Sequence, residues 1–213
     1  MKQLTYPSKT SLDVNDITAD DISIDDICHS LARQCRYNGH LNRDMYSIAQ
    51  HSLLVATLLL AAKKDVYHIL AGLVHDFGEA YLGDIITPVK SMIREDYDRL
   101  EMKILDALAK KYGIETCFTE DVWKTVMEYD QLAYRIETYL LREISYEESV
   151  IAIEIDPAYT PLADVSVRHT EEALKASFFG LLSSIKEEVP EESRYASIKQ
   201  KFRAYVDGLE ENS

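Results

Sequence analysis

The sequence predicts an all-α fold, a bundle of helices that forms one domain over residues 1–213. Apolar residues recur at spacings of three and four along most of the chain, as they do on one face of a helix. Only seven glycines and five prolines interrupt the 213 residues, which leaves few turns for a many-stranded sheet. The chain has no internal repeat and no linker rich in proline or serine, so nothing divides it into parts.

The first three helices are expected over residues 24–35, 47–63 and 66–81. The first carries two aspartates near its N-terminus, where their charge complements the helix dipole. The second begins with Ser-Ile-Ala-Gln at Ser47, which is a capping-box signature. The third stops at Gly83, because glycine is favoured just beyond the end of a helix.

A loop separates these helices from the second half of the chain. It is expected over residues 84–90, because Pro88 disfavours a helical conformation at the residue before it. Residues 149–162 are ambiguous between an extended segment and a buried connection. Further helices are expected over these ranges: 91–111, 120–146, 167–187 and 191–208. The core is expected to include three aromatic residues at helical spacing: Trp123, Tyr129 and Tyr134.

Composition excludes several classes of protein. The net charge of −14 argues against binding polymeric nucleic acid through a basic face. No apolar stretch reaches the roughly 20 residues that a membrane span needs, and the first residues lack the apolar core of a signal peptide. The three cysteines form no CxxC pair, which favours reduced thiols. We therefore expect a cytoplasmic protein that binds neither polymeric nucleic acid nor membrane.

The stretch LAGLVHDFGEAYLGD, residues 70–84, places His75 and Asp76 side by side within an apolar run. Each residue of a helix advances by about 100°, so these side chains lie on neighbouring faces and Glu79 falls between them. A buried carboxylate without a partner is costly enough that it becomes protonated or binds a cation. The pattern therefore indicates that these groups have a partner, which the adjacent His-Asp pair does not identify by itself.

Two other expected helices direct an ionisable side chain towards the same interior. His51 shares the helical spacing of the apolar residues around it, and so does Asp130 in the helix over 120–146. Taken singly, an inward histidine is more often a hydrogen-bonded core residue, and Asp130 has Arg135 nearby as a partner. Together, two imidazoles and two carboxylates suit a divalent transition metal with positions open to water or substrate.

Three stretches carry a family resemblance: YSIAQHSLLVA, GLVHDFGEAYLGDIITPVK and EYDQLAYRIE. They resemble the H…HD…D signature of the HD-domain metal-dependent phosphohydrolases over about residues 12–142, with 143–213 expected as helices packed on the same domain. The likeness is strongest to bacterial 5'-deoxynucleotidases and to related phage-type hydrolases that include a dATP triphosphohydrolase. Gln50 departs from the pattern, since many relatives have glutamate before the first histidine.

The resemblance implies one divalent ion per chain, with these ligands: His51, His75, Asp76 and Asp130. It also implies that Glu79 orients or deprotonates the attacking water, a role that suits a carboxylate one turn from His75. Asp84 would protonate the leaving oxygen or position the nucleophile, although a simple turn aspartate explains it equally well. Mn, Co, Zn, Fe and Ni all fit such a site.

Phosphate recognition needs fixed positive charge besides the metal. In the deoxynucleotidases that the chain resembles, an arginine followed by an aromatic residue contacts phosphate and sugar, which implies these roles for Arg36 and Tyr37. Tyr37 would pack against deoxyribose and disfavour a 2'-hydroxyl group. Lys90 is a second candidate for binding phosphate, although a surface lysine is the commoner explanation.

The expected function is hydrolysis of deoxyribonucleoside 5'-monophosphates to release phosphate, with a metal-bound water as the nucleophile. The metal site then lies between the helices over 47–63, 66–81 and 120–146. One alternative is removal of tripolyphosphate from a deoxynucleoside triphosphate, and another is a non-catalytic sensor of nucleotide or metal. The expected partners are a small nucleotide and further copies of the chain, with the helix over 191–208 as an interface element.

Overall fold

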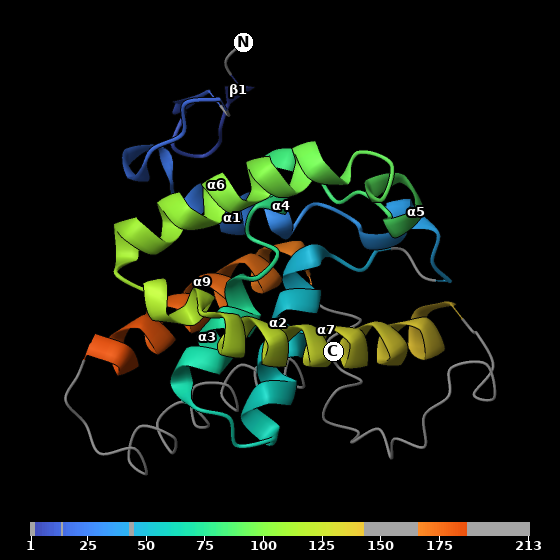
Figure 1. The fold of residues 1–213 in the computed structure, drawn as a ribbon. Helices are drawn as coiled ribbons and strands as arrows, with labels where there is room; N and C mark the ends of the chain where they lie inside the picture. Colours follow the sequence, from blue (N-terminus) through green and yellow to red (C-terminus); the bar gives the residue numbers. More distant parts are fainter. Residues whose placement is uncertain (1–2, 14, 43–44, 143–165, 187–213) are drawn as a thin grey trace.

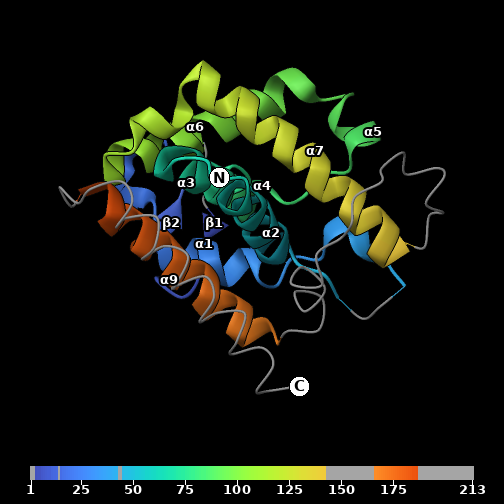
Figure 2. The ribbon, with the colours of Figure 1, turned by 90° about the horizontal axis from the view of Figure 1, so that it is seen from below.

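Two neighbouring helices, α2 (Ile48–Ala61) and α3 (Val66–Val74), lie at the centre of the fold in the computed structural model (Figure 1). Helix α7 (Glu120–Arg142) packs against both of them, and so does α9 (Val167–Lys186). The second view shows α7 on one side of this pair and α9 on the other (Figure 2). The structure describes these residues: 3–13, 15–42, 45–142 and 166–186.

The remaining elements surround this centre and confirm the predicted all-α fold. The other helices of the described residues are α1 (Ile24–Leu31), α4 (Glu79–Leu82), α5 (Thr87–Lys90) and α6 (Arg94–Tyr112). Three short 3₁₀ helices join them: η1 (Ala19–Asp21), η2 (Arg36–Gly39) and η3 (Glu115–Phe118). Within the described ranges the only strands are β1 (Gln3–Leu4) and β2 (Ser11–Leu12), which pair in antiparallel fashion.

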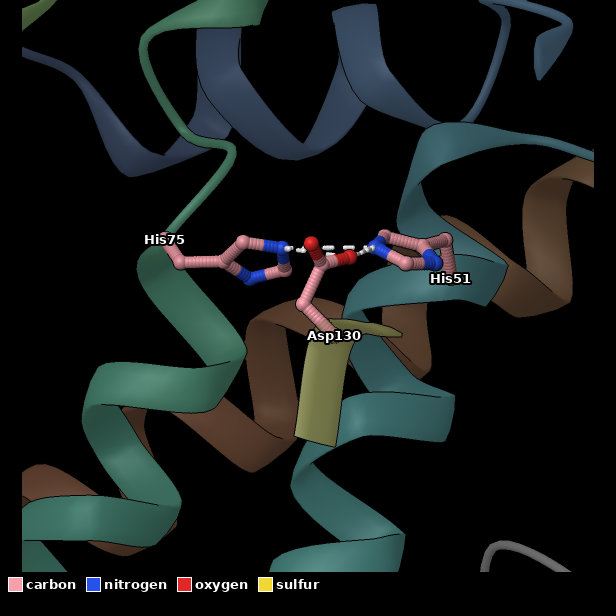
Figure 3. A group of neighbouring side chains, drawn as sticks. All are labelled: His51, His75 and Asp130. Carbon is pink, nitrogen blue, oxygen red and sulfur yellow. Dashed lines mark hydrogen bonds and ion pairs between the residues drawn. The ribbon is translucent and has the colours of Figure 1, made fainter. Parts of the chain in front are cut away.

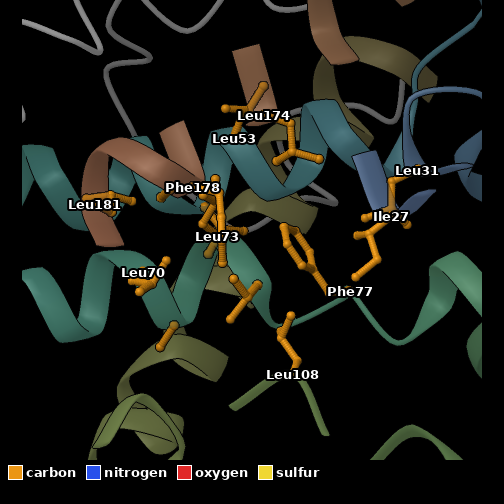
Figure 4. Close-up of a cluster of buried hydrophobic side chains, with 14 of the residues drawn as sticks. Ile27, Leu31, Leu53, Leu70, Leu73, Phe77, Leu108, Leu174, Phe178 and Leu181 are labelled. Atoms are coloured by element: carbon orange, nitrogen blue, oxygen red, sulfur yellow. The ribbon is translucent and has the colours of Figure 1, made fainter. Parts of the chain in front are cut away.

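Burial of apolar side chains between α2, α3, α7 and α9 forms the core. Figure 4 shows Leu53 of α2, Leu73 of α3 and Phe178 of α9 in one cluster, and all three side chains are buried. Removing a side chain of this size from water stabilises a fold by about 1.5–3 kcal/mol. Gly72 lets α2 come close to α3, because a Cβ atom there would overlap the side chain of Leu59.

The N-terminus of α2 is fixed by the capping box that the sequence predicts. The Ser47 hydroxyl accepts a hydrogen bond from the Gln50 backbone N–H at 3.2 Å, and Gln50 Oε1 accepts one from the Ser47 N–H at 2.8 Å. Both ends of the box are buried, so each donor would otherwise lack a partner. The helices predicted over 47–63, 91–111 and 167–187 correspond to α2, α6 and α9.

Helix α1 is shorter than the helix predicted over 24–35. It ends at Leu31, because the chain turns so that Cys35 forms an antiparallel bridge with Ser47. This bridge ties the segment before η2 to the start of α2. The apolar spacing continues through Cys35, but the helical backbone conformation ends earlier. The spacing alone therefore overestimates the length of this helix.

The single helix predicted over 66–81 is wrong, because the chain breaks between α3 and α4. Helix α3 ends at Val74 and α4 begins at Glu79, and between them the backbone N–H groups bond to carbonyls three residues back. Helix α6 passes close to this turn: a Cβ atom on Gly78 would lie 2.9 Å from Glu101 Cγ. The break therefore falls at the segment that carries the His-Asp pair.

The loop predicted over 84–90 is wrong in part, because α5 occupies Thr87–Lys90. Pro88 lies in the first turn of α5. The N–H groups of a first turn form no hydrogen bond within the helix, so a proline, which has no N–H, is tolerated there. Several predictions lie outside the described residues: the ends of the helices over 120–146 and 167–187, the segment 149–162 and the helix over 191–208. Among the helices that are described, none is long and apolar enough to cross a membrane.

Candidate metal centre

His51, His75 and Asp130 point towards one another from three different elements (Figure 3). His51 belongs to α2, His75 follows the last residue of α3, and Asp130 lies on α7. The Nε2 atoms of the two histidines are 3.2 Å apart, and His51 Nε2 is 3.1 Å from Asp130 Oδ1. His75 Nε2 lies 3.9 Å from the same oxygen. Both imidazole rings are buried, so this group is withdrawn from solvent.

Asp76 completes the set of four candidate ligands. Its Oδ2 atom is 3.4 Å from His51 Nε2, and its Oδ1 atom is 3.3 Å from His75 Nε2. Asp76 lies in the turn after α3, so the break in the helix places its carboxylate beside both rings. The structure thus brings together all four residues that the sequence analysis assigns to a metal.

Hydrogen bonds on the far side of each ring determine which nitrogen faces the cluster. His75 Nδ1 donates to the Gly72 carbonyl at 2.8 Å, and His51 Nδ1 donates to Glu137 Oε1 at 2.6 Å. In a neutral imidazole this leaves Nε2 without a proton, as a metal ligand requires. Two nitrogen lone pairs and carboxylate oxygens then converge on one point. Such an arrangement repels itself unless a cation stands between the groups.

The separations fit one divalent ion. Atoms bound about 2.1 Å from a shared ion stand about 3.0–3.5 Å from one another. The five separations given above, each measured from a histidine Nε2, run from 3.1 to 3.9 Å, and four of them fall in this range. Two imidazole nitrogens with carboxylate oxygens suit a transition metal better than Ca²⁺ or Mg²⁺, which prefer oxygen alone.

Without the ion, protons take its place. Burial and the nearby Arg36 guanidinium both disfavour a charged His51 ring, but the Glu137 and Asp130 carboxylates outweigh them and raise its pKa to about 10. Burial also opposes a charge on His75, yet Asp76 raises the pKa of that ring. The cluster therefore attracts positive charge at neutral pH, whether as protons or as a metal ion.

Glu79 lies one turn from this cluster, at the start of α4, and it is buried. Burial first, and then the charges of Asp76 and Asp84, hold the pKa of Glu79 well above its ordinary value. Its Oε2 atom has no hydrogen-bond partner among the described residues, and Oε1 is 3.9 Å from Lys90 Nζ. A carboxyl group of this kind can accept and hold a proton near neutral pH.

Lys90 lies beside this carboxyl group. Its Nζ atom is 3.4 Å from Glu101 Oε1 and 4.2 Å from the centre of the Tyr97 ring. The sequence assigns Lys90 to phosphate, and that role stays a prediction. The contacts of this side chain place its charge between the buried carboxyl group of Glu79 and the partly buried carboxyl group of Glu101.

A cavity of about 670 Å³ adjoins the cluster, and Arg36, Tyr37 and Asp84 all line it. Arg36 Nη1 lies 3.4 Å from Asp76 Oδ2, so the guanidinium connects the cavity to the candidate ligands. Burial raises the pKa of Asp84 against the opposing charge of Arg36. The expectation that Tyr134 belongs to the core is wrong, because its side chain is 41% exposed and lines this cavity.

Glu137 and Gln34 belong to the site but were not identified from the sequence. Glu137 is buried among Arg36, Tyr37 and His51, and its only sequence signal is a spacing of seven from Asp130, which places both on one face of α7. Gln34 supports the turn at α4: its Nε2 donates to the Glu79 carbonyl at 3.0 Å, and its Oε1 accepts from the Asp84 N–H at 3.3 Å.

Comparisons with known proteins agree with this arrangement. A family model described as "HD domain" matches residues 30–193. An uncharacterized protein of Rhodobacter capsulatus is 36% identical over 141 residues, which cover 65% of this chain and 72% of that protein. The uncharacterized protein YfdR of Escherichia coli strain K12 is 41% identical over 98 residues, which cover 46% of this chain and 51% of YfdR.

We expect the affinity of this site for Mn²⁺ or Co²⁺ to increase with pH. At neutral pH the metal-free protein carries a proton on His51, whose pKa is about 10, and a bound ion must displace that proton. The affinity should therefore rise by up to about tenfold per pH unit between about pH 6 and pH 8. Isothermal titration calorimetry at three pH values measures this, and a constant affinity over the range would contradict the site.

Proposed function

This chain belongs to the HD domain family, and we propose that it hydrolyses deoxyribonucleoside 5'-monophosphates to release phosphate. The HD domain and its buried His and Asp cluster identify a metal-dependent phosphohydrolase in general terms. The choice of substrate is our proposal. It depends on one observation: the cavity beside the cluster combines the partly buried Arg36 with two tyrosine rings.

Arg36 supplies the phosphate-binding charge in this proposal. Its side chain is 12% exposed and lines the cavity, while its Nη1 atom approaches Asp76. A guanidinium group pairs with phosphate oxygens through two parallel hydrogen bonds. This interaction is stronger in a site that contains little water. A phosphate bound here would lie between Arg36 and the candidate metal ligands.

Tyr37 and Tyr134 supply the nucleoside-binding surface. The centres of their rings are 6.3 Å apart, and both line the cavity. Aromatic rings of this kind pack against a sugar or stack with a base. The volume of about 670 Å³ lies in the range of small-molecule sites and accommodates one mononucleotide. Close packing of Tyr37 against the sugar would disfavour a 2'-hydroxyl group.

The chemistry divides among the residues of this chain. A divalent ion held by the cluster would polarise a phosphoryl oxygen and lower the pKa of water. Glu79 accepts the proton of the attacking water, because its raised pKa suits a general base near neutral pH. Asp84, whose pKa burial also raises, donates a proton to the 5'-oxygen as the bond between phosphorus and that oxygen breaks.

A second candidate function is removal of tripolyphosphate from a deoxynucleoside triphosphate. The observation that favours it is a second guanidinium group in the cavity, Arg142, which lies 5.3 Å from the centre of the Tyr37 ring. Two arginines at one cavity can bind a chain of phosphates as well as a single one. Both functions would use the same four candidate ligands.

A panel of nucleotides separates these functions. We expect orthophosphate from deoxyribonucleoside monophosphates in the presence of Mn²⁺ or Co²⁺, and slower release from the corresponding ribonucleotides. The assay measures orthophosphate and tripolyphosphate from deoxy- and ribonucleoside mono- and triphosphates. Tripolyphosphate as the main product would instead support the second candidate. Absence of hydrolysis from a metal-loaded protein would contradict both and favour a nucleotide or metal sensor.

Glu79→Gln should retain the metal but lose most of the rate. The amide keeps the shape of the side chain but cannot accept the proton of water, so kcat should fall by about 10²–10⁴-fold. Steady-state kinetics and the Mn²⁺ affinity of the same preparation measure the two effects separately. Glu95→Gln, an exposed position on α6, is the matched control and should leave both unchanged. Unchanged turnover in Glu79→Gln would mean that another group is the base.

A further inference from the structure

We propose that Glu137 is a positioning residue that joins the metal-binding and substrate-binding halves of the site. It contacts His51, a candidate metal ligand, through one carboxylate oxygen, and Arg36 and Tyr37 through the other. The metal half of this inference depends only on the cluster, whereas the substrate half rests on the proposed function. The experiments below keep the two separate.

The Glu137 carboxylate lies in the interior, with its side chain 1% exposed. Oε1 accepts hydrogen bonds from His51 Nδ1 at 2.6 Å and from the Tyr46 hydroxyl at 3.1 Å. Oε2 accepts a hydrogen bond from the Tyr37 hydroxyl at 2.5 Å and forms an ion pair with Arg36 Nε at 3.3 Å. Each oxygen therefore has two partners, and the two sets of partners serve different purposes.

On the metal side, Glu137 determines how His51 presents its ring. The carboxylate accepts the hydrogen bond from Nδ1, so Nε2 is the nitrogen that faces the cluster and would bind the metal. Glu137 contacts the nitrogen that faces away from His75, so it acts through His51 rather than as a ligand. Outer partners of this kind orient the ring and increase its basicity.

On the substrate side, Glu137 holds a strained loop in place. Tyr37 and Asn38 have φ values of 57° and 51°, in the left-handed region that bulky residues rarely adopt, and Gly39 follows at 77°. The hydroxyl of Tyr37 is fixed by Oε2, and this bond keeps the ring at the wall of the cavity. Strain at such a position persists only where the surroundings hold it.

The position of Glu137 on α7 makes the connection rigid. Asp130 lies seven residues earlier on the same face of this helix, so one helix carries both a candidate ligand and the residue that orients His51. Arg36 and Tyr37 reach the same carboxylate from η2. The distance between the bound phosphate and the metal would thus depend on one side chain.

Two substitutions distinguish this role from a merely structural one. Glu137→Ala removes both connections, and it should weaken Mn²⁺ binding by about 10–100-fold. Glu137→Gln keeps the shape, and its carbonyl still accepts from His51, so it should lose less Mn²⁺ affinity than Glu137→Ala. At saturating Mn²⁺, however, an amide cannot pair with the Arg36 charge. We therefore expect Glu137→Gln to raise KM for a deoxynucleoside monophosphate by about tenfold.

The preference for deoxy over ribo substrates should also fall in Glu137→Gln, because Tyr37 loses its anchor. Calorimetry with Mn²⁺ alone measures the metal half, and steady-state kinetics measure KM, kcat and the deoxy-to-ribo ratio. Glu128→Gln, the same change at an exposed position of α7, is the matched control and should resemble the wild type. If the Glu137→Ala protein does not fold, the measurements on Glu137→Gln test the proposal by themselves.

Two results would overturn the proposal. One is a Glu137→Gln protein with the Mn²⁺ affinity, KM and deoxy-to-ribo ratio of the wild type. The other is a KM lower than that of the wild type, which is expected if Glu137 only neutralises Arg36. A wild-type protein that hydrolyses no deoxynucleoside monophosphate would refute the proposed function, and the Mn²⁺ affinities would still test the metal half.

Discussion

The close approach of two buried imidazole nitrogens is the constraint on which the rest of the site depends. His51 Nε2 and His75 Nε2 are 3.2 Å apart, and the opposite nitrogen of each ring already donates a hydrogen bond elsewhere. One carboxylate oxygen of Asp76 and one of Asp130 lie 3.4 and 3.1 Å from His51 Nε2. Such a cluster is tolerable in the interior only with added positive charge, which either protons or a metal ion can supply.

The packing of the helices explains why the cluster forms where it does. Helices α2, α3 and α7 are in mutual contact at the centre of the bundle, and α2, the residue after α3, and α7 each bring a side chain to the same point. The chain then leaves α3 in a turn, so Asp76 and Glu79 follow His75 without continuing along a helix axis. The chain continues through α4 to Asp84, which lines the cavity.

The features that could be predicted from the sequence are those that depend on residues close to one another along the chain. The cap at Ser47 and the positive φ of Gly83 after α4 depend on neighbouring residues, so the start of α2 and the end of α4 could be located. At the break after α3, α6 passes close to Gly78, a contact between distant segments that no local pattern encodes. The four candidate ligands were recognisable as ionisable groups in apolar stripes, whereas Glu137 resembles an ordinary helix glutamate until its partners are known.

The location of a bound metal tests this account most directly. Crystals of the protein grown with Co²⁺, measured at the cobalt absorption edge, give an anomalous difference map of the ion. The account predicts one peak about 2.1 Å from Nε2 of His51 and of His75 and from a carboxylate oxygen of Asp130. A folded protein that binds Co²⁺ only at other residues, or not at all, would contradict it.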